Sequence, residues 1–162
     1  MKRDSRIHFL SWDHHTALME SFKITKFIDS KSTEGLFQLR AQIINFWKEH
    51  LLQHFRAEEE CLLPRLALYQ DTDEFISKTL TEHIQIHKII LLIKESTGEK
   101  DLKIYLKHFA KLLNDHIRFE ERDLFEAIQS LLTDEQLNQI YSEITERYGD
   151  KYTNQDCQLP QV

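Results

Sequence analysis

Apolar residues recur at helical spacing along almost the whole chain, and only a few short stretches interrupt the repeat. The interruptions are Gly35, the stretch 69–73 and the stretch 96–98. They leave four long segments, roughly 6–31, 34–69, 72–96 and 99–131. A capping box that begins at Thr133 predicts a fifth, short helix over about 133–148. Because short connections make neighbouring helices antiparallel, we expect an all-α, up-down-up-down four-helix bundle with an additional short C-terminal helix.

Length and composition limit the number of domains, the partners and the compartment of the protein. The chain has 162 residues, enough for one domain with a sizeable core, so we expect a domain over 1–150, a bundle core over about 7–131 and a flexible tail over 151–162. A formal charge of −6 without a basic block argues against a nucleic-acid partner. We see no signal peptide or membrane-spanning run, and two cysteines suit a reducing compartment, so we expect a cytoplasmic protein without a membrane partner.

Histidines and glutamates continue the apolar stripes that should face the core. In the second segment the stripe runs on through His54 and Glu58, and in the fourth through His116 and Glu120. A histidine and a glutamate four residues apart lie on one face of a helix, so both can reach a common ion. The other segments add further candidates to this set. In the first segment Leu18 and Phe22 share a face with His15, and in the third the stripe runs through Ile76, Leu80, His83, His87 and Ile90.

These side chains together predict a metal centre. A buried carboxylate without a partner costs several kcal/mol, whereas a cation compensates it directly. Mixed imidazole and carboxylate ligands suit iron, manganese or zinc, and they argue against calcium. Candidates on four helices are too many for one ion, so we expect a binuclear site. The ferritin-like alternative needs a Glu three residues before a His, and that spacing is absent from the sequence.

The motifs resemble those of the hemerythrin and HHE cation-binding family, in its bacterial single-domain form, over about residues 7–131. The matching stretches are Asp13-His14-His15-Thr-Ala-Leu18-Met19, His54-x-x-x-Glu58-Glu59 with Leu62-Leu63-Pro64, Glu82-His83-x-x-x-His87, and His116-x-x-x-Glu120-Glu121. The resemblance implies two iron ions, Fe2+ or Fe3+, with a bridging oxo or hydroxo group.

The resemblance also implies a role for each candidate. The nitrogen ligands would be His15, His54, His83, His87 and His116, and the bridging carboxylates Glu58 and Glu120. One coordination position would stay open, on the iron held by His15 and His54, and O2, peroxide, NO or azide would bind there.

Several assignments remain open at this point. His14 could replace His15, which is preferred because its spacing to Leu18 and Met19 matches the family. Glu121 stands where oxygen-binding members carry their Asp, five residues after the histidine, and is the second choice to Glu120. Some members lack one ligand of the third helix, which makes His87 less secure than His83.

Three functions are compatible with such a centre. The first is binding of O2 or a related small ligand for storage, delivery or sensing, by a monomer or homodimer. The second is an enzyme that removes hydrogen peroxide or nitric oxide, or an iron donor for cluster repair. The third is a structural or sensing module held together by zinc. Similar ligand sets support all of these, so the sequence does not choose among them.

Overall fold

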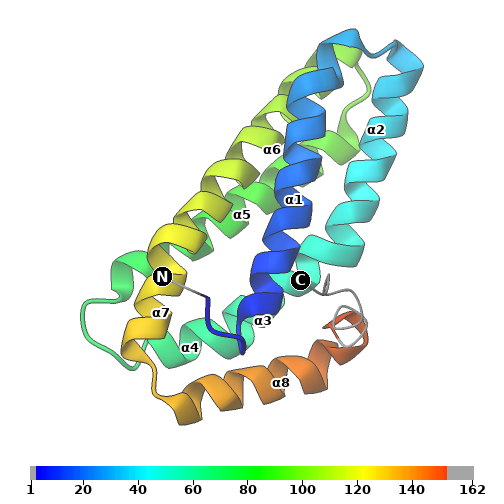
Figure 1. The fold of residues 1–162 in the computed structure, drawn as a ribbon. Helices are drawn as coiled ribbons and strands as arrows, with labels where there is room; N and C mark the ends of the chain where they lie inside the picture. Colours follow the sequence, from blue (N-terminus) through cyan, green and yellow to red (C-terminus); the bar gives the residue numbers. More distant parts are fainter. Residues whose placement is uncertain (1–2, 153–162) are drawn as a thin grey trace.

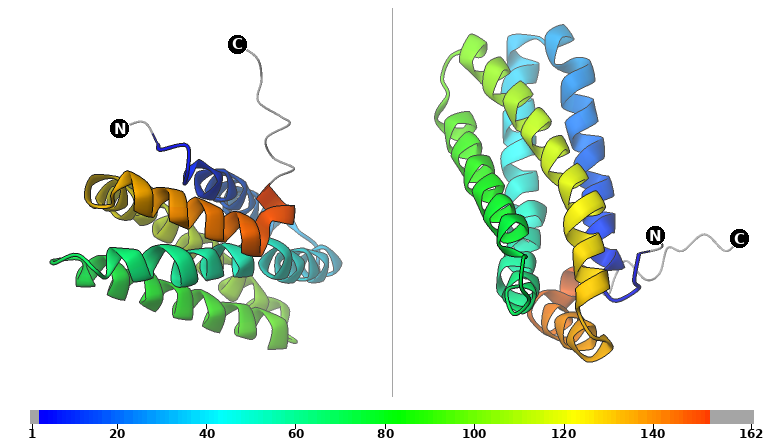
Figure 2. Two further views of the ribbon diagram at one scale, coloured as in Figure 1. Left: turned by 90° about the horizontal axis from the view of Figure 1, so that it is seen from below. Right: turned by 90° about the vertical axis from the view of Figure 1, so that its left-hand side faces the viewer.

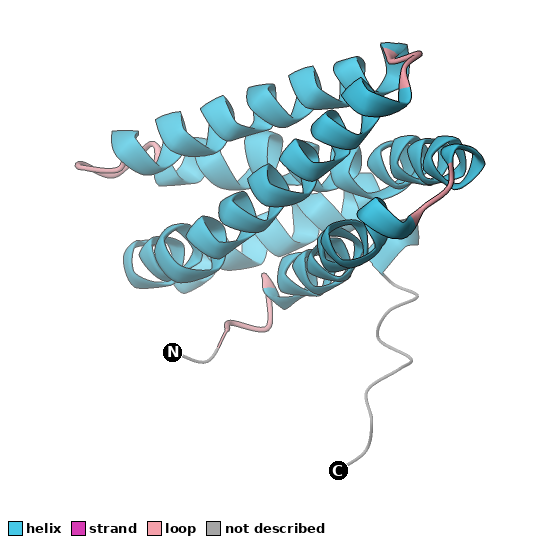
Figure 3. Cartoon of the chain, turned by 90° about the horizontal axis from the view of Figure 1, so that it is seen from above, coloured by secondary structure: helices cyan, strands magenta, loops and turns pink. Residues whose placement is uncertain are grey.

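The computed structural model describes residues 3–152, and the side chains from 150 onward lie outside what is described. All regular structure in this part of the chain is helical, which confirms the predicted fold class (Figure 3). The predicted tail over 151–162 falls almost wholly outside the described residues. Among those residues, no helix is both long and apolar enough to cross a membrane.

Four long helical rods form the bundle, and each follows the sequence segments closely (Figure 1). The first is α1 (His8–Phe27) with the 3-10 turn η1 (Ile28–Ser30), and the third is α5 (Asp73–Glu95). The second rod runs through α2 (Thr33–Phe46), η2 (Trp47–Leu51), α3 (Leu52–Ala57), η3 (Glu58–Leu62) and α4 (Leu63–Leu66). The fourth runs through α6 (Glu99–Phe119), η4 (Glu120–Leu124) and α7 (Phe125–Leu131).

Local sequence chemistry starts the helices where the interruptions predict. The Ser32 side chain accepts a hydrogen bond from the Gly35 amide and so caps α2. The predicted capping box is confirmed: the Gln136 amide donates to Thr133 Oγ1 at 3.2 Å, and the Thr133 amide donates to Gln136 Oε1 at 2.9 Å. This box starts α8 (Asp134–Tyr152), which crosses the end of the bundle in both views of Figure 2.

The second and fourth rods contain π-helical turns, η2, η3 and η4. Each π turn accommodates one residue more than an α-helical turn, so it rotates the side chains beyond it relative to those before it. Glu58 is the first residue of η3 and Glu120 is the first residue of η4. The two carboxylates predicted to bridge the ions therefore occupy equivalent places in the two rods.

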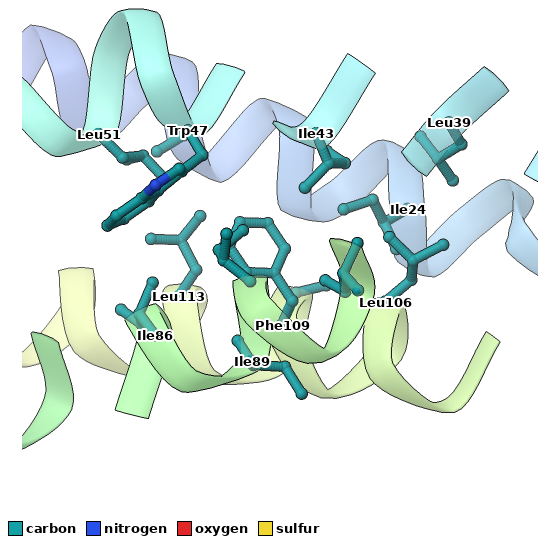
Figure 4. Close-up of a cluster of buried hydrophobic side chains, with 14 of the residues drawn as sticks. Ile24, Leu39, Ile43, Trp47, Leu51, Ile86, Ile89, Leu106, Phe109 and Leu113 are labelled. Atoms are coloured by element: carbon teal, nitrogen blue, oxygen red, sulfur yellow. The ribbon is translucent and has the colours of Figure 1, made fainter. Parts of the chain in front are cut away.

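Two apolar clusters form the core, and buried polar side chains lie between them. The first lies in the long part of the bundle and includes Ile24, Ile43 and Phe109 (Figure 4). The second lies at the end that α8 closes, where Leu137, Ile140 and Ile144 are buried. The apolar face of the fifth helix thus packs across this chain's own bundle.

The structure corrects two of the predicted stripes. The α1 stripe placed Leu18 and Phe22 on one inward face with His15, yet Phe22 is 56% exposed and His15 is exposed too. The buried face of α1 is displaced by about one residue from the predicted face. It consists of Leu10, His14, Ala17, Ser21, Ile24 and Ile28, with the small residues Ala17 and Ser21 at its middle. In α5, Leu80 of the predicted stripe is 38% exposed, because the buried face of the helix passes through Thr79 and His83 instead.

Candidate metal centre

Six polar side chains from all four rods converge between the two apolar clusters. They form two overlapping groups that share both glutamates: His14, His54, Glu58 and Glu120, and Glu58, His83, His116 and Glu120. Within each group the potential ligand atoms lie within 4.8 Å of one another, and all six residues are buried. Two overlapping groups with two shared carboxylates have the arrangement of a binuclear site.

Each shared glutamate directs one oxygen toward each group. Glu58 places Oε1 3.2 Å from His54 Nε2 and Oε2 3.4 Å from His83 Nε2. Glu120 places Oε2 3.1 Å from His14 Nε2 and Oε1 3.2 Å from His116 Nε2. Carboxylates disposed in this way can bridge two ions, and the first turns of η3 and η4 hold them there.

The four histidines present Nε2 to the centre because a carboxylate binds the other nitrogen of each ring. Nδ1 lies 2.6 Å from Glu121 Oε1 in His14 and 2.7 Å from Glu59 Oε1 in His83. It lies 3.1 Å from Asp13 Oδ2 in His54 and 2.9 Å from Glu82 Oε2 in His116. A carboxylate that accepts the Nδ1–H fixes the tautomer with a free Nε2 and makes that nitrogen a stronger ligand.

The ligand arrangement repeats with an approximate twofold relation between the halves of the chain. His14 in the first half corresponds to His83 in the second. The acid before each of them binds the other histidine of the same half: Asp13 binds His54, and Glu82 binds His116. The second histidine, His54 or His116, is followed four residues later by a glutamate that both groups share, and then by a further acid, Glu59 or Glu121. That last acid binds the first histidine of the opposite half. The relation makes the two candidate ion positions nearly equivalent.

The site leaves several buried polar atoms unsatisfied, and a pair of cations would satisfy them. Among the described residues, both carboxylate oxygens of Glu58 and of Glu120 lack a hydrogen-bond partner, as do Nε2 of His83 and of His116. Buried polar groups are rarely left so, and the cost is greatest for charged ones. Four imidazole nitrogens and two carboxylates form a donor set suited to iron, manganese or zinc.

Without ions, charge pairing between the histidines and glutamates shifts their ionisation. Burial acts to lower the pKa of His14, but Glu120 and Glu121 outweigh it and raise the pKa to about 10. Burial likewise opposes protonation of His83, yet its carboxylate neighbours raise its pKa to about 11. Burial acts to raise the pKa of Glu120, and the histidines around it lower it well below the ordinary value. Ions that bind here must therefore displace protons.

The structure differs from the sequence prediction on the first helix: His14, not His15, lies in the cluster. His14 is 3% exposed and its ring stacks on Phe125 with centroids 5.2 Å apart, whereas His15 is exposed. The reason is the rotated inward face of α1, which carries Leu10 and Ala17 with His14.

His87 is the other predicted ligand that lies outside both groups. It is half-buried, and its ring meets Trp47 edge-on at 4.6 Å between centroids. Phe55 separates this region from the cluster by stacking on His83 at 3.7 Å. Burial lowers the pKa of His87, in contrast to His14, His54 and His83, whose carboxylate neighbours raise theirs.

The acids that bind the histidines are site residues to which the sequence prediction gave no such role. Asp13, Glu59 and Glu82 stand next to predicted or alternative ligands, and Glu121 was weighed only as a bridging ligand. Their common signal is an acid directly beside each histidine of the first and third helices and each bridging glutamate. Which acid meets which histidine depends on tertiary packing, so the partners are not readable from local sequence.

Comparison with known proteins found a similar longer protein and a matching family. A protein from Nostoc sp. (strain PCC 7120 / SAG 25.82 / UTEX 2576) named DNA nickase is 33% identical over 97 residues, which cover 57% of this chain and 26% of that relative. The chain thus aligns with only about a quarter of its relative's length. No solved structure gives a significant match. The family described as the hemerythrin HHE cation-binding domain matches residues 7–128. The chain therefore belongs to the hemerythrin HHE cation-binding domain family.

Proposed function

We propose that the protein holds two iron ions at this centre and binds O2, or a related small ligand such as peroxide or NO, beside them. His14, His54, His83 and His116 would hold the ions, and Glu58 and Glu120 would bridge them. The iron pair would supply a redox-active binding position. This ligand set replaces the sequence-based one at His15 and leaves out His87.

The observation that carries the proposal is a small cavity against the centre. Its volume is about 10 Å3, and residues of both candidate ion groups line it, among them His54 and His116. A volume of this order holds about one water-sized molecule. Leu51, Leu113 and Ile117 form its apolar wall. With ions held by the neighbouring ligands, this space would admit nothing larger than a small molecule such as a diatomic, and the apolar wall would limit the access of water.

The number of protein ligands also supports the proposal, because it would leave coordination positions on the ions open to such a molecule. Each ion would receive two histidine nitrogens and one oxygen from each bridging glutamate. Six-coordinate iron would then have room for further ligands on both ions, because His87 is outside the cluster. The sequence-based expectation placed a single open position at one ion.

The test is metal analysis followed by optical spectroscopy of the purified protein. We expect two irons per chain and, on exposure of the reduced protein to O2, a visible charge-transfer band that disappears when O2 is removed. The His14→Gln and His15→Gln chains form a matched pair, and only the first should lose the band. One zinc per chain and no iron would contradict the proposal.

Turnover of hydrogen peroxide or NO is the second candidate, and the near-twofold site favours it. Two ions with equivalent open positions could act on one small molecule together, which a single open position could not. The measurement is disappearance of peroxide or NO at protein concentrations far below that of the substrate. Consumption limited to one equivalent per chain would contradict an enzyme and leave simple binding.

Release of iron for cluster repair and nicking of DNA are weaker alternatives. Release requires iron that an acceptor removes readily, whereas the six ligands lie buried in the bundle. Nicking of DNA is suggested only by the name of the Nostoc relative, and a formal charge of −6 does not favour binding of a polyphosphate such as DNA. Incubation of supercoiled plasmid with the iron-loaded protein tests it, and we expect the plasmid to stay closed.

A further inference from the structure

The N-terminal segment breaks the near-twofold relation of the centre at one point. Arg3 Nη2 donates to Glu121 Oε2 at 2.6 Å and to the Glu121 carbonyl oxygen at 2.9 Å. Glu121 Oε1 is the atom that binds His14 Nδ1. A fixed positive charge thus binds the carboxylate that supports one ligand of the centre.

A second contact brings the same charge toward His14. The Arg3 guanidinium carbon lies 4.7 Å from the centroid of the Phe125 ring, and Phe125 stacks on His14. The Arg3 side chain is 14% exposed, so water screens it less than it would a surface arginine. Arginine remains charged at every pH at which the protein would be studied.

The equivalent acid on the other side has no such partner. Glu59 binds His83 Nδ1 as Glu121 binds His14 Nδ1, with oxygen–nitrogen distances of 2.7 and 2.6 Å. Among the side chains of residues 3–149, Glu59 and Glu82 form ion pairs with histidines and with no lysine or arginine. The carboxylate behind His14 therefore has an arginine as its second partner, whereas the described part of the chain supplies no such cation to the carboxylate behind His83.

We propose that Arg3 makes the two ion positions unequal, so that the ion held by His83 and His116 binds more tightly than the ion held by His14 and His54. A carboxylate on Nδ1 increases the donor strength of Nε2 and adds negative charge near the ion. Arg3 offsets both effects on the His14 side. The inference rests on the proposed two-ion centre, and it makes the His14 ion the one that is loaded last and lost first.

Titration of the metal-free full chain with Co2+ at fixed pH tests this by calorimetry and by the visible absorption of bound cobalt. The wild type should bind two ions in two resolved steps. Arg3→Gln should tighten the weaker step by about tenfold, at the lower end of the range for groups behind metal ligands, and leave the tighter step unchanged. Arg3→Lys keeps the charge and should leave the steps unequal.

Two further variants separate this charge effect from loss of structure. Arg6 belongs to the same segment but pairs with Asp4 and Asp134, so Arg6→Gln should leave both steps unchanged. Glu59→Gln should weaken the tighter step by about tenfold. Equal steps in the wild type, or a weaker step that is unchanged or weakened in Arg3→Gln, would overturn the inference. Binding of fewer than two ions by the wild type would instead contradict the proposed function.

Discussion

Adjacent histidines at positions 14 and 15 point about 100° apart around the axis of α1, and this difference decides which of them can meet an ion. His14 lies 3.0 Å from His54 through their Nε2 atoms, whereas His15 is exposed. His14 and His15 therefore allow a direct comparison of a buried and an exposed histidine at adjacent positions. Any property that depends on the centre should respond to one of them and not to the other.

Substitution of each histidine by glutamine uses this contrast. His14→Gln removes a ligand nitrogen and should weaken binding of one ion by at least about 100-fold, since loss even of a group behind a ligand costs about 10–100-fold. His15→Gln should leave both ions bound with wild-type affinity. Metal content after dialysis against a mild chelator measures the difference. Loss of an ion from the His15→Gln chain would restore the sequence-based assignment.

The raised pKa values of His14 and His83 predict how the metal-free protein responds to pH. Histidines paired with carboxylates bind protons more tightly in the folded chain, with pKa values of about 10 and about 11, than at the ordinary value of 6.5. The folded state therefore holds more protons than the unfolded state above pH 6.5. This contribution is complete below pH 6.5 and is lost as the pH rises toward 10.

Urea unfolding of the metal-free protein between pH 6.5 and 10 measures this loss. The free energy of unfolding should fall across the window, and the His14→Gln chain should show a shallower fall because it has one paired histidine fewer. Affinity for ions should rise over the same window, since fewer protons compete for Nε2. A free energy of unfolding that rises with pH would contradict the assignment of protonated histidines.

At the scale of the helical elements, α8 covers the end of the bundle nearest the centre. Its residues Leu137, Ile140 and Ile144 are buried, and Arg65 of the second rod makes a two-bond ion pair with Glu143 at 2.6 and 3.0 Å. Tyr141, on the same helix, is 42% exposed. One face of α8 is therefore buried in the core, whereas the neighbouring face that carries Tyr141 is partly exposed.

Alanine at Ile140 and at Tyr141 distinguishes these faces. Ile140 is fully buried, so Ile140→Ala should lower the free energy of unfolding by about 2–5 kcal/mol. Tyr141→Ala removes a partly exposed ring and should cost less than about 1 kcal/mol. Chemical denaturation of the metal-loaded chains measures both. Equal effects would mean that α8 does not seal the core as described.

The elements also show what the sequence could predict. The apolar repeat predicted four helical segments and the capping box at Thr133 the fifth, each to within a few residues, because Gly35, the short polar stretches and the capping box are strong local signals. It misplaced the inward face of α1, where Ala17 and Ser21 are buried while Phe22 is exposed, so hydrophobicity alone favoured the wrong face. Small residues at such positions let helices approach closely, which is a tertiary property.

The site was predictable to a similar extent. The His-x-x-x-Glu pairs at His54 and His116 were placed correctly in one cluster because one face of a single helix carries both members. The position of His87 was not predictable, since it depends on how Trp47 and Phe55 pack against α5. The π turns at Glu58 and Glu120 were not predicted from the apolar repeat, yet the two carboxylates shared by both candidate ion groups lie at their first residues.

At the scale of the whole molecule, the cavity lies between the metal centre and the apolar cluster of the long part of the bundle. Residues of this cluster therefore contribute both to the stability of the core and to the size of ligand that the cavity can hold. Leu113 and Leu106 both lie on α6, are both fully buried and both belong to this cluster, but only Leu113 lines the cavity. Truncation of either leucine should destabilise the core to a similar extent, but only truncation of Leu113 should change the space beside the metal centre.

Leu113→Ala and Leu106→Ala should each lower the free energy of unfolding by about 2–5 kcal/mol, because each leaves a void in a packed core. Only Leu113→Ala enlarges the space beside His54 and His116, so only this chain should bind a longer ligand better. We expect about a tenfold rise in its affinity for azide, the effect of relieving a contact of about one methylene, with little change for NO. Visible absorption of the iron-loaded chains measures both affinities. If Leu106→Ala changed azide binding as much as Leu113→Ala, ligand size would be controlled by general loosening of the bundle rather than by the wall of this cavity.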